Sequence, residues 1–316
     1  MWNTVEPSSV PSRSSVTRAT RSRPGSTLKP LRPFPRSVSA SSRPWTFLLA
    51  PVDQGIRNVG GRPGACQAPE HLWAGLQTED MVPESARVRE VEVDNTDDSL
   101  ETDLDRLSQA VADELADDRL PIVLGGDHGT TFATVRGAVR ELVDVGVAYL
   151  DVHLDVRAFE PRHTSGSSFR RLIEEGWVEP EHVRALGIQT PENPEEASGD
   201  KAPFTELRAW AREQGLVVEG LDEVRQRPAW ALGQALSSGV EWCLSLDLDA
   251  LDARWAPGVS APGSPRFTLE EACRAAEAAR GGYRVLDVVE YSPPLDEDER
   301  TLDSCLQLLA AALGEA

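Results

Sequence analysis

Lysine is nearly absent from this sequence. Only Lys29 and Lys201 are lysine among 316 residues, and 52 Asp and Glu outnumber 32 Lys and Arg, which gives a formal net charge of −20. Such an acid surplus argues against nucleic-acid binding, because it would repel phosphates. Hydrated carboxylates also keep a surface soluble when salt screens its charges. Two hypotheses therefore stay open: a halophilic prokaryotic source, and an ordinary acidic protein from a GC-rich bacterium.

Cysteine is scarce, and long apolar runs are missing. The four cysteines are scattered and form no Cys-x-x-Cys motif: Cys66, Cys243, Cys273 and Cys305. This spacing excludes a thiolate zinc motif and a disulfide framework, and it favours reduced, mostly buried thiols in a cytoplasmic protein. No apolar run approaches the roughly 20 residues of a transmembrane helix, so we expect no membrane partner.

Residues 1–45 differ in composition from the rest of the chain. They are rich in Ser, Pro and Arg, and Glu6 is their only acid. With few apolar groups to offset the entropy of ordering, they are predicted to form a disordered leader. Their Arg and Ser content resembles an organellar transit peptide. The acidic, Lys-poor body argues against that, so a start codon placed too far upstream is the preferred interpretation.

From Thr46 onward, strand-like and helical patterns alternate. Apolar, β-branched runs predict strands at 46–52, 88–95, 120–126, 146–154, 182–189, 216–220, 241–249 and 284–291. Helical patterns lie between them, for example at 100–116, 131–143, 206–214 and 269–280, and 298–313 closes the chain. Strands that alternate with helices predict an α/β domain over residues 46–316, with a mostly parallel, eight-stranded sheet covered on both faces.

Metal-type ligands follow three of these apolar runs. One run ends in Asp-x-His-x-Asp, whose alternate positions share a face in an extended chain. Another ends in Gly-Gly-Asp-His, and a third in Asp-x-Asp. Taken alone, the first motif could be a polar strand end in solvent, and the single His a core histidine. Open parallel sheets, however, place their sites at the carboxyl ends of strands.

Together these motifs supply two imidazoles and four carboxylates, which are too many for one ion and suit two. Carboxylate-rich ligation without thiolates favours Mn²⁺ over a structural Zn²⁺ site. The predicted ligands of two Mn²⁺ ions per chain are His128, Asp151, His153, Asp155, Asp247 and Asp249.

The order of these motifs resembles their order in the ureohydrolase family, which comprises arginases, agmatinases and formimidoylglutamases. Gly-Gly-Asp-His, Asp-x-His-x-Asp and Ser-x-Asp-x-Asp follow one another here in the same order as in that family. The resemblance runs from about Thr46 to the C-terminus. It implies a three-layer α/β/α sandwich, a two-manganese site that activates a bridging water, and ring-like homo-oligomers. All six predicted ligands match the family's metal positions. Val152 stands where Ala is usual and Ala253 where Pro is usual, and neither is a ligand.

Three loops most resemble those of formimidoylglutamases. They are residues 53–65, 164–169 and 256–262. In the first, Asn58 and Arg62 are candidate substrate-binding residues, although a charged loop is often only solvated. In the second, Ser165 replaces a histidine of agmatinases, and Ser165 or Ser167 could equally cap the next helix. Arg157 stands where arginases have Asn, and its guanidinium matches a carboxylate bidentately.

The resemblance also implies a reaction. An acid at the place of Glu290 holds the amidine or guanidine in this family, and Asp155 is our candidate proton carrier. The best fit is hydrolysis of N-formimidoyl-L-glutamate to L-glutamate and formamide in histidine degradation. An agmatinase or another guanidino-compound hydrolase is the alternative, although Arg157 and Arg62 would repel the cationic tail of agmatine. A catalytically silent, metal-binding partner subunit is an alternative of another class.

Overall fold

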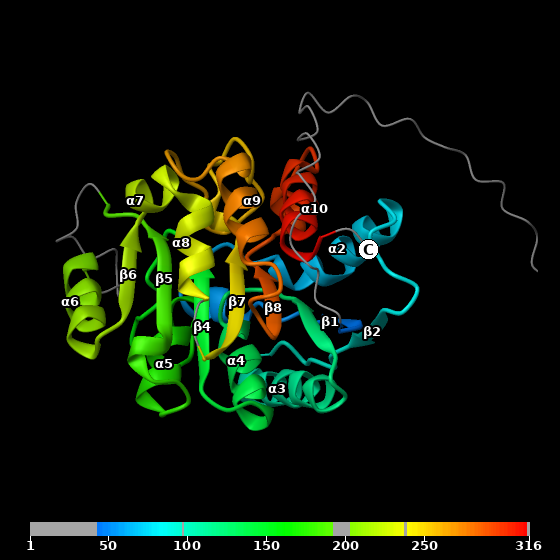
Figure 1. Ribbon diagram of the computed structural model, residues 1–316, viewed down its shortest axis with the longest axis horizontal. Coiled ribbons are helices and arrows are strands. Elements are labelled where there is room, and N and C mark those ends of the chain that lie inside the picture. Colours follow the sequence, from blue (N-terminus) through cyan, green and yellow to red (C-terminus); the bar gives the residue numbers. More distant parts are fainter. Residues whose placement is uncertain (1–42, 97, 192–202, 237–238, 315–316) are drawn as a thin grey trace, which may run out of the picture. The chain divides into compact units, whose positions relative to one another are not determined.

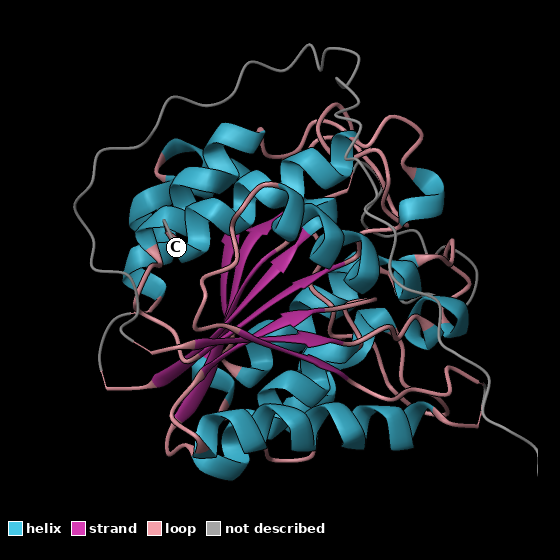
Figure 2. Ribbon diagram, turned by 90° about the vertical axis from the view of Figure 1, so that its right-hand side faces the viewer, coloured by secondary structure: helices cyan, strands magenta, loops and turns pink. Residues whose placement is uncertain are grey.

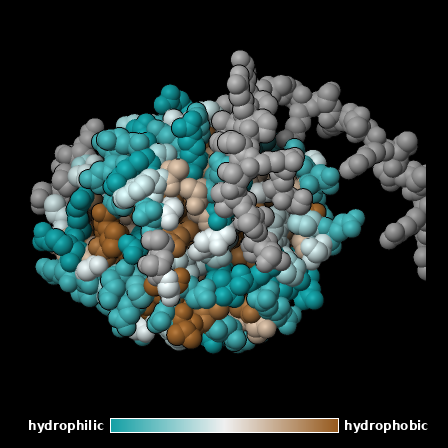
Figure 3. All heavy atoms as spheres, viewed as in Figure 1, coloured by the Kyte–Doolittle hydropathy of each residue, from teal (hydrophilic) through white to brown (hydrophobic). Residues whose placement is uncertain are grey.

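The computed structural model describes residues 43–316, apart from residues 97, 192–202, 237–238 and 315–316. The expected leader, residues 1–45, lies almost wholly outside the described residues and stays a prediction. Among the described helices, none is long and apolar enough to cross a membrane. Hydrophilic residues cover most of the face drawn in Figure 3, where apolar residues form only small patches.

One sheet of eight strands organises the fold, in the order β2-β1-β3-β8-β7-β4-β5-β6. Every strand pair is parallel, so the expected mostly parallel sheet is confirmed and is in fact wholly parallel. The strands are β1 (Trp45–Leu49), β2 (Arg87–Glu90), β3 (Leu120–Leu124), β4 (Val145–Leu150), β5 (Val183–Ile188), β6 (Val217–Gly220), β7 (Glu241–Asp247) and β8 (Val285–Val289).

Helices cover both faces of the sheet, which confirms the predicted α/β/α sandwich (Figures 1 and 2). On one face α4 packs between α3 and α5. On the other face α9 packs between α8 and α10, and α10 also packs against α2. The helices are α1 (Gln54–Asn58), α2 (Ala68–Thr78), α3 (Leu100–Ala116), α4 (Thr130–Glu141), α5 (Ser168–Glu174), α6 (Phe204–Gln214), α7 (Leu221–Gln226), α8 (Pro228–Ala235), α9 (Leu269–Ala278) and α10 (Arg300–Leu313).

Burial explains which strands were easy to predict. The central strands β3, β4 and β8 are buried along their whole length, because helices cover them on both sides. Their sequences are accordingly almost continuous apolar runs. The edge strand β2 is exposed at all four positions and carries Arg87, Arg89 and Glu90. Charged side chains on an edge strand oppose pairing with another chain.

Seven of the eight predicted strands extend too far at their carboxyl ends. The strand predicted at 146–154 ends at Leu150, so the Asp-x-His-x-Asp motif lies in a loop, and the prediction that it lines one strand face is wrong. The strand predicted at 241–249 ends at Asp247, and the one predicted at 88–95 ends at Glu90. In the first two, aspartate side chains capture the backbone N–H two residues later, which competes with sheet pairing. Asp151 Oδ1 accepts from His153 N at 2.8 Å, and Asp247 Oδ1 accepts from Asp249 N at 2.7 Å.

Candidate metal centre

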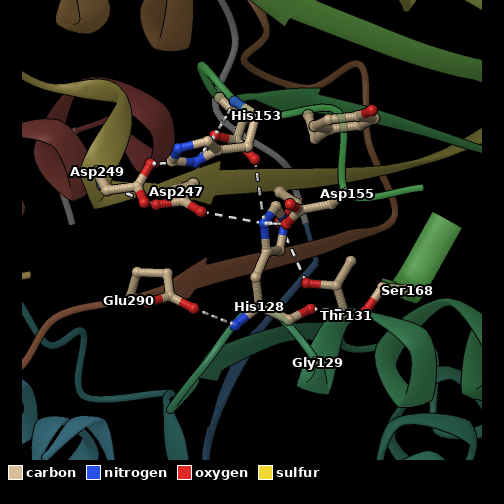
Figure 4. A network of polar contacts seen from close by, with 12 residues as sticks. His128, Gly129, Thr131, His153, Asp155, Ser168, Asp247, Asp249 and Glu290 are labelled. Atoms are coloured by element: carbon tan, nitrogen blue, oxygen red, sulfur yellow. Dashed lines mark hydrogen bonds and ion pairs between the residues drawn. The ribbon is translucent and has the colours of Figure 1, made fainter. Parts of the chain in front are cut away.

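The six predicted ligands meet at the carboxyl ends of β3, β7 and β4, near the middle of the sheet (Figure 4). The first group of four surrounds the His128 ring. Its Nδ1 lies 2.8 Å from Asp155 Oδ2, 3.0 Å from Asp247 Oδ2 and 3.3 Å from Asp151 Oδ2. Ligand atoms that lie about 2.1 Å from one octahedral ion are separated by about 3 Å, so this spacing suits a cation.

The second group contains Asp151, His153 and Asp249. His153 Nδ1 lies 3.2 Å from Asp249 Oδ1 and 3.4 Å from Asp151 Oδ1. Asp151 therefore belongs to both groups, with one carboxylate oxygen directed to each. That is the geometry expected of a ligand that bridges two ions.

Buried atoms without hydrogen bonds support a cation at this place. His128 Nδ1, Asp151 Oδ2 and Asp249 Oδ1 are buried, and within the described residues none of them has a partner of hydrogen-bonding geometry. Such atoms are costly unless something compensates them, and a divalent cation bound by imidazole and carboxylate does so. The His153 side chain is 41% exposed, which leaves the cluster accessible from that side.

The charges of the cluster are unbalanced without a cation. Burial and the charges of Asp249 and Asp151 hold the pKa of Asp247 well above its usual value. Burial opposes protonation of His128, but the surrounding aspartates outweigh it and hold the pKa of this histidine well above its ordinary value. Four carboxylates against two imidazoles thus draw protons into the site, and two divalent cations would replace those protons.

Glu290 lies beside the cluster at the end of β8. Its Oε1 accepts a hydrogen bond of 2.8 Å from His128 N, and its own N–H donates to Gly126 O (Figure 4). Burial and the charges of Asp247 and Asp127 raise its pKa well above the usual value. Glu290 and Asp155 have φ angles of 70° and 48°, a region that non-glycine residues seldom occupy. Strain of this kind is concentrated at functional sites.

Arg157 lies two residues beyond the cluster and is only partly exposed. Its Nη1 is buried without a hydrogen-bond partner among the described residues. Burial lowers its pKa, although the charge of Asp155 opposes this. A Cβ on Gly166 would lie 2.9 Å from both Cδ and Nε of Arg157, so glycine there leaves room for this side chain. The structure thus places next to the metal cluster a guanidinium with one buried nitrogen that has no hydrogen-bond partner among the described residues.

The other predicted substrate residues are engaged differently. Asn58 donates to His163 O and accepts from Gln54, and it lines a cavity of about 310 Å³ that none of the six predicted ligands lines. Arg62 donates from Nε to Ser260 O at 2.9 Å and from Nη2 to Val259 O at 2.6 Å, which ties two of the predicted loops together. Both side chains hold loops in place, and their contact with substrate stays a prediction.

The loop of Ser165 is held by its neighbours. Ser165 begins a 3₁₀ turn (Ser165–Ser167), and Ser167, the N-cap residue of α5, makes no side-chain capping hydrogen bond. The Ser167 hydroxyl accepts from Thr164 N at 2.8 Å, so Ser167 rather than Ser165 stabilises the start of this turn. A role of Ser165 toward substrate stays a prediction.

Asp127, which sequence patterns did not single out, joins two loops of the site. Asp127 Oδ2 accepts from Ile56 N and Oδ1 accepts from Gly129 N, both at 2.8 Å. Burial raises its pKa to about 7. The preceding Gly126 cannot carry a side chain, because a Cβ there would lie 1.7 Å from Val52 O. The signal available in the sequence was an acid placed directly between a glycine and a predicted ligand.

His163, for which sequence patterns indicated no role, lies between the loops that follow β3 and β4. The ring is 3% exposed, with Nε2 3.0 Å from Gly129 O and Nδ1 3.1 Å from Ser167 Oγ. Burial lowers its pKa to about 4. It is therefore a neutral side chain that joins the loop after β3 to the loop after β4.

Known proteins resemble this chain in sequence and architecture. The family model described as the arginase family matches residues 44–314. A formimidoylglutamase of Rhodococcus opacus (strain B4) is 33% identical over 270 residues, which are 81% of this chain and 80% of the relative. A guanidinobutyrase of Pseudomonas aeruginosa is 31% identical over 188 residues, 58% of this chain and 56% of the relative.

The fold is equally well matched among solved structures. The crystal structure of Trypanosoma cruzi formiminoglutamase with Mn²⁺ has a TM-score of 0.74 and 26% sequence identity. The match covers 86% of this chain and 92% of that one. Sequence and fold therefore lead to the same family over nearly the whole described chain.

Proposed function

Since this chain belongs to the arginase family and is a hydrolase of carbon–nitrogen bonds in linear amidines, we propose that it is a formimidoylglutamase. It converts N-formimidoyl-L-glutamate and water to L-glutamate and formamide. The observation that carries this substrate is the buried, unpartnered Nη1 of Arg157. A substrate with two carboxylates away from its amidine supplies the anion that this guanidinium lacks.

The six clustered side chains hold two divalent cations, which we propose to be Mn²⁺. Oxygen and imidazole ligands without thiolate suit Mn²⁺, and the relative from Trypanosoma cruzi is described with that ion. When bound, the cations lower the pKa of water and thereby supply a nucleophile at neutral pH. His128, Asp155 and Asp247 would hold one cation and His153 and Asp249 the other, and Asp151 would contribute to both sites.

Glu290 and Asp155 act on the substrate. One oxygen of Glu290 is held by His128 N, so the carboxylate is oriented before substrate arrives and its second oxygen can pair with the cationic amidinium. Asp155, whose Oδ2 lies 2.8 Å from His128 Nδ1, is our candidate to pass a proton to the departing amine. Arg157, helped by Asn58, Arg62 and Ser165, anchors the carboxylates.

The setting of the reaction follows from the same assignment. We place the enzyme in histidine degradation, in the cytoplasm, and as a homo-oligomer. The resemblance to formimidoylglutamases supports the pathway and the assembly. Free cysteines support the compartment, since Cys66 is partly exposed and Cys243, Cys273 and Cys305 are buried.

Two alternatives differ in what they require. A guanidino acid carries a carboxylate that Arg157 could bind, and one relative is named guanidinobutyrase, so this substrate class is the second candidate. Agmatine has a cationic tail that Arg157 would repel. A silent subunit would not need Glu290, which this chain retains beside a complete cluster.

Activity with and without metal tests the proposal. Protein stripped with chelator and reloaded with Mn²⁺ should hydrolyse N-formimidoyl-L-glutamate, and the stripped protein should not. Asp247→Ala, which removes a ligand of the first group, should lower bound Mn²⁺ and abolish turnover. Full activity of the stripped protein would contradict the metal mechanism, and an inactive but Mn²⁺-loaded protein would favour the silent subunit.

A further inference from the structure

An acid that belongs to neither metal group lies buried within the sheet. Asp287 is in β8 and is 0% exposed. Neither of its carboxylate oxygens has a hydrogen bond of ordinary geometry within the described part of the chain, and it has no ion pair there. A buried carboxylate without compensation is costly, so its surroundings must explain its presence.

Three hydroxyl-bearing side chains lie on the strand and the helix that pack against β8. Ser245 of β7 is its partner in the parallel register, so both side chains project from the same face of the sheet. Thr131 and Thr134 lie one helical turn apart on α4, which packs against β7 and β8. Burial raises the pKa of Asp287, and the hydroxyls of Ser245, Thr131 and Thr134 oppose that rise.

Ser245 connects this acid to the metal cluster. Its Oγ lies 3.2 Å from Nε2 of His128 and 3.3 Å from Oγ1 of Thr131, which lies beside the His128 ring in Figure 4. The opposite ring nitrogen, Nδ1, faces the carboxylates of the first metal group. A polar path therefore runs from the cluster through the imidazole to Ser245, whose partner in the parallel register is Asp287.

The direction of the hydrogen bonds follows from counting protons. Nδ1 can hold a cation only when it carries no proton, so the neutral ring carries its proton on Nε2. That N–H donates to Ser245 Oγ. A serine hydroxyl has one proton and two acceptor sites, so Ser245 can accept from His128 and Thr131 while it donates to Asp287. When Asp287 is ionised, its carboxylate can only accept, and it then favours this direction.

We propose that Asp287, acting through Ser245, is a positioning residue that fixes His128 in the tautomer presenting Nδ1 to the metal. Metal-binding histidines usually donate their second N–H to a carboxylate, carbonyl or water. Here a hydroxyl stands between the ring and the acid. The inference rests on the proposed metal role of His128, and it assigns a purpose to a buried charge that the reaction itself does not use.

Mn²⁺ affinity tests this role without reference to the substrate. The variants are Asp287→Asn, which keeps the shape but loses the charge, and Ser245→Ala, which breaks the path. Each should weaken Mn²⁺ binding by about 10- to 100-fold in competition with a chelator. Because both changes interrupt one path, the double variant should bind little more weakly than either single variant. Ser108→Ala, which removes another fully buried hydroxyl, should bind Mn²⁺ as the parent does.

The stability of the metal-free protein separates positioning from a merely structural role. Asp287→Asn removes a buried charge, so its metal-free melting temperature should stay equal or rise. An unchanged Mn²⁺ affinity in both variants, or a loss of metal-free stability that alone accounts for weaker binding, would overturn the inference. A parent protein that binds no Mn²⁺ would instead contradict the proposed function.

Discussion

The carboxylate of Asp151 contacts both histidines of the metal cluster, with Oδ2 3.3 Å from His128 Nδ1 and Oδ1 3.4 Å from His153 Nδ1. It is fully buried. Burial raises the pKa of Asp151, but the two histidines lower it by more than burial raises it, so this pKa lies below its usual value. One side chain therefore makes the two metal groups into a single site.

Metal stoichiometry should reflect this sharing. Asp249→Ala removes a ligand of the second group only, so it should leave about one Mn²⁺ per chain, whereas Asp151→Ala should leave less than one. Elemental analysis after gel filtration measures both values. Equal losses in the two variants would contradict the assignment of Asp151 to both groups.

Glu290 should affect catalysis without affecting metal. Glu290→Gln keeps the shape but loses the charge that pairs with the amidinium, a contact worth about 2–4 kcal/mol, so kcat/KM should fall roughly 30- to 1,000-fold. Mn²⁺ content should match that of the parent, because Glu290 belongs to neither metal group. Steady-state kinetics on metal-saturated protein, together with elemental analysis, test this. Loss of Mn²⁺ in the variant would show that Glu290 is a ligand.

A side chain at Gly166 should lower activity, because it would displace Arg157. Gly166→Ala places a Cβ 2.9 Å from Cδ and Nε of Arg157, so the guanidinium must move and kcat/KM on N-formimidoyl-L-glutamate should fall at least about tenfold. Gly233→Ala is the matched control, because its nearest atoms are 3.5 Å away. Kinetics of both variants at saturating Mn²⁺ decide the matter, and equal activities would show that the position of Arg157 is unimportant.

His163 should make the metal-free protein less stable in acid. Burial lowers its pKa to about 4, so between about pH 6.5 and pH 4 the unfolded chain binds a proton that the folded one does not. Its contribution to the free energy of unfolding therefore falls as pH falls, by about 2 kcal/mol from pH 8 to pH 5.

Denaturant unfolding in chelator at both pH values measures this effect. From pH 8 to pH 5, the free energy of unfolding of His163→Gln should fall by about 2 kcal/mol less than that of the parent. The exposed His71→Gln variant should follow the parent. Parallel losses in the parent and His163→Gln would show that His163 is not buried as a neutral group.

Sequence patterns predicted the strands best where burial controls them. β3 and β8 are apolar because helices cover both faces, and the predictions met their amino ends within a residue. The predicted carboxyl ends lie too far along the chain in β3 and β8 as well as in β4 and β7, and in the last two Asp151 and Asp247 bind their own loops and end the strand. Apolar periodicity carries no information about such side-chain contacts.

The site was predictable as a set of ligands but not as a network. All six predicted ligands lie together, because parallel strands bring their carboxyl ends to one edge of the sheet. Which of them is shared depends on rotamers of Asp151. Arg62 binds the carbonyls of Val259 and Ser260, almost 200 residues away, and no local pattern indicates such a contact.

Competition between two substrates tests the central claim, that this enzyme selects a dicarboxylate amidine. With equal N-formimidoyl-L-glutamate and agmatine and saturating Mn²⁺, the ratio of formamide to urea gives the ratio of the two kcat/KM values. The parent should form almost only formamide. Arg157→Asn should lower kcat/KM for the dicarboxylate about 30- to several-thousand-fold, and Arg157→Lys, which keeps the charge, should lose less. Preferential consumption of agmatine by the parent, or an unchanged ratio in Arg157→Asn, would contradict the account.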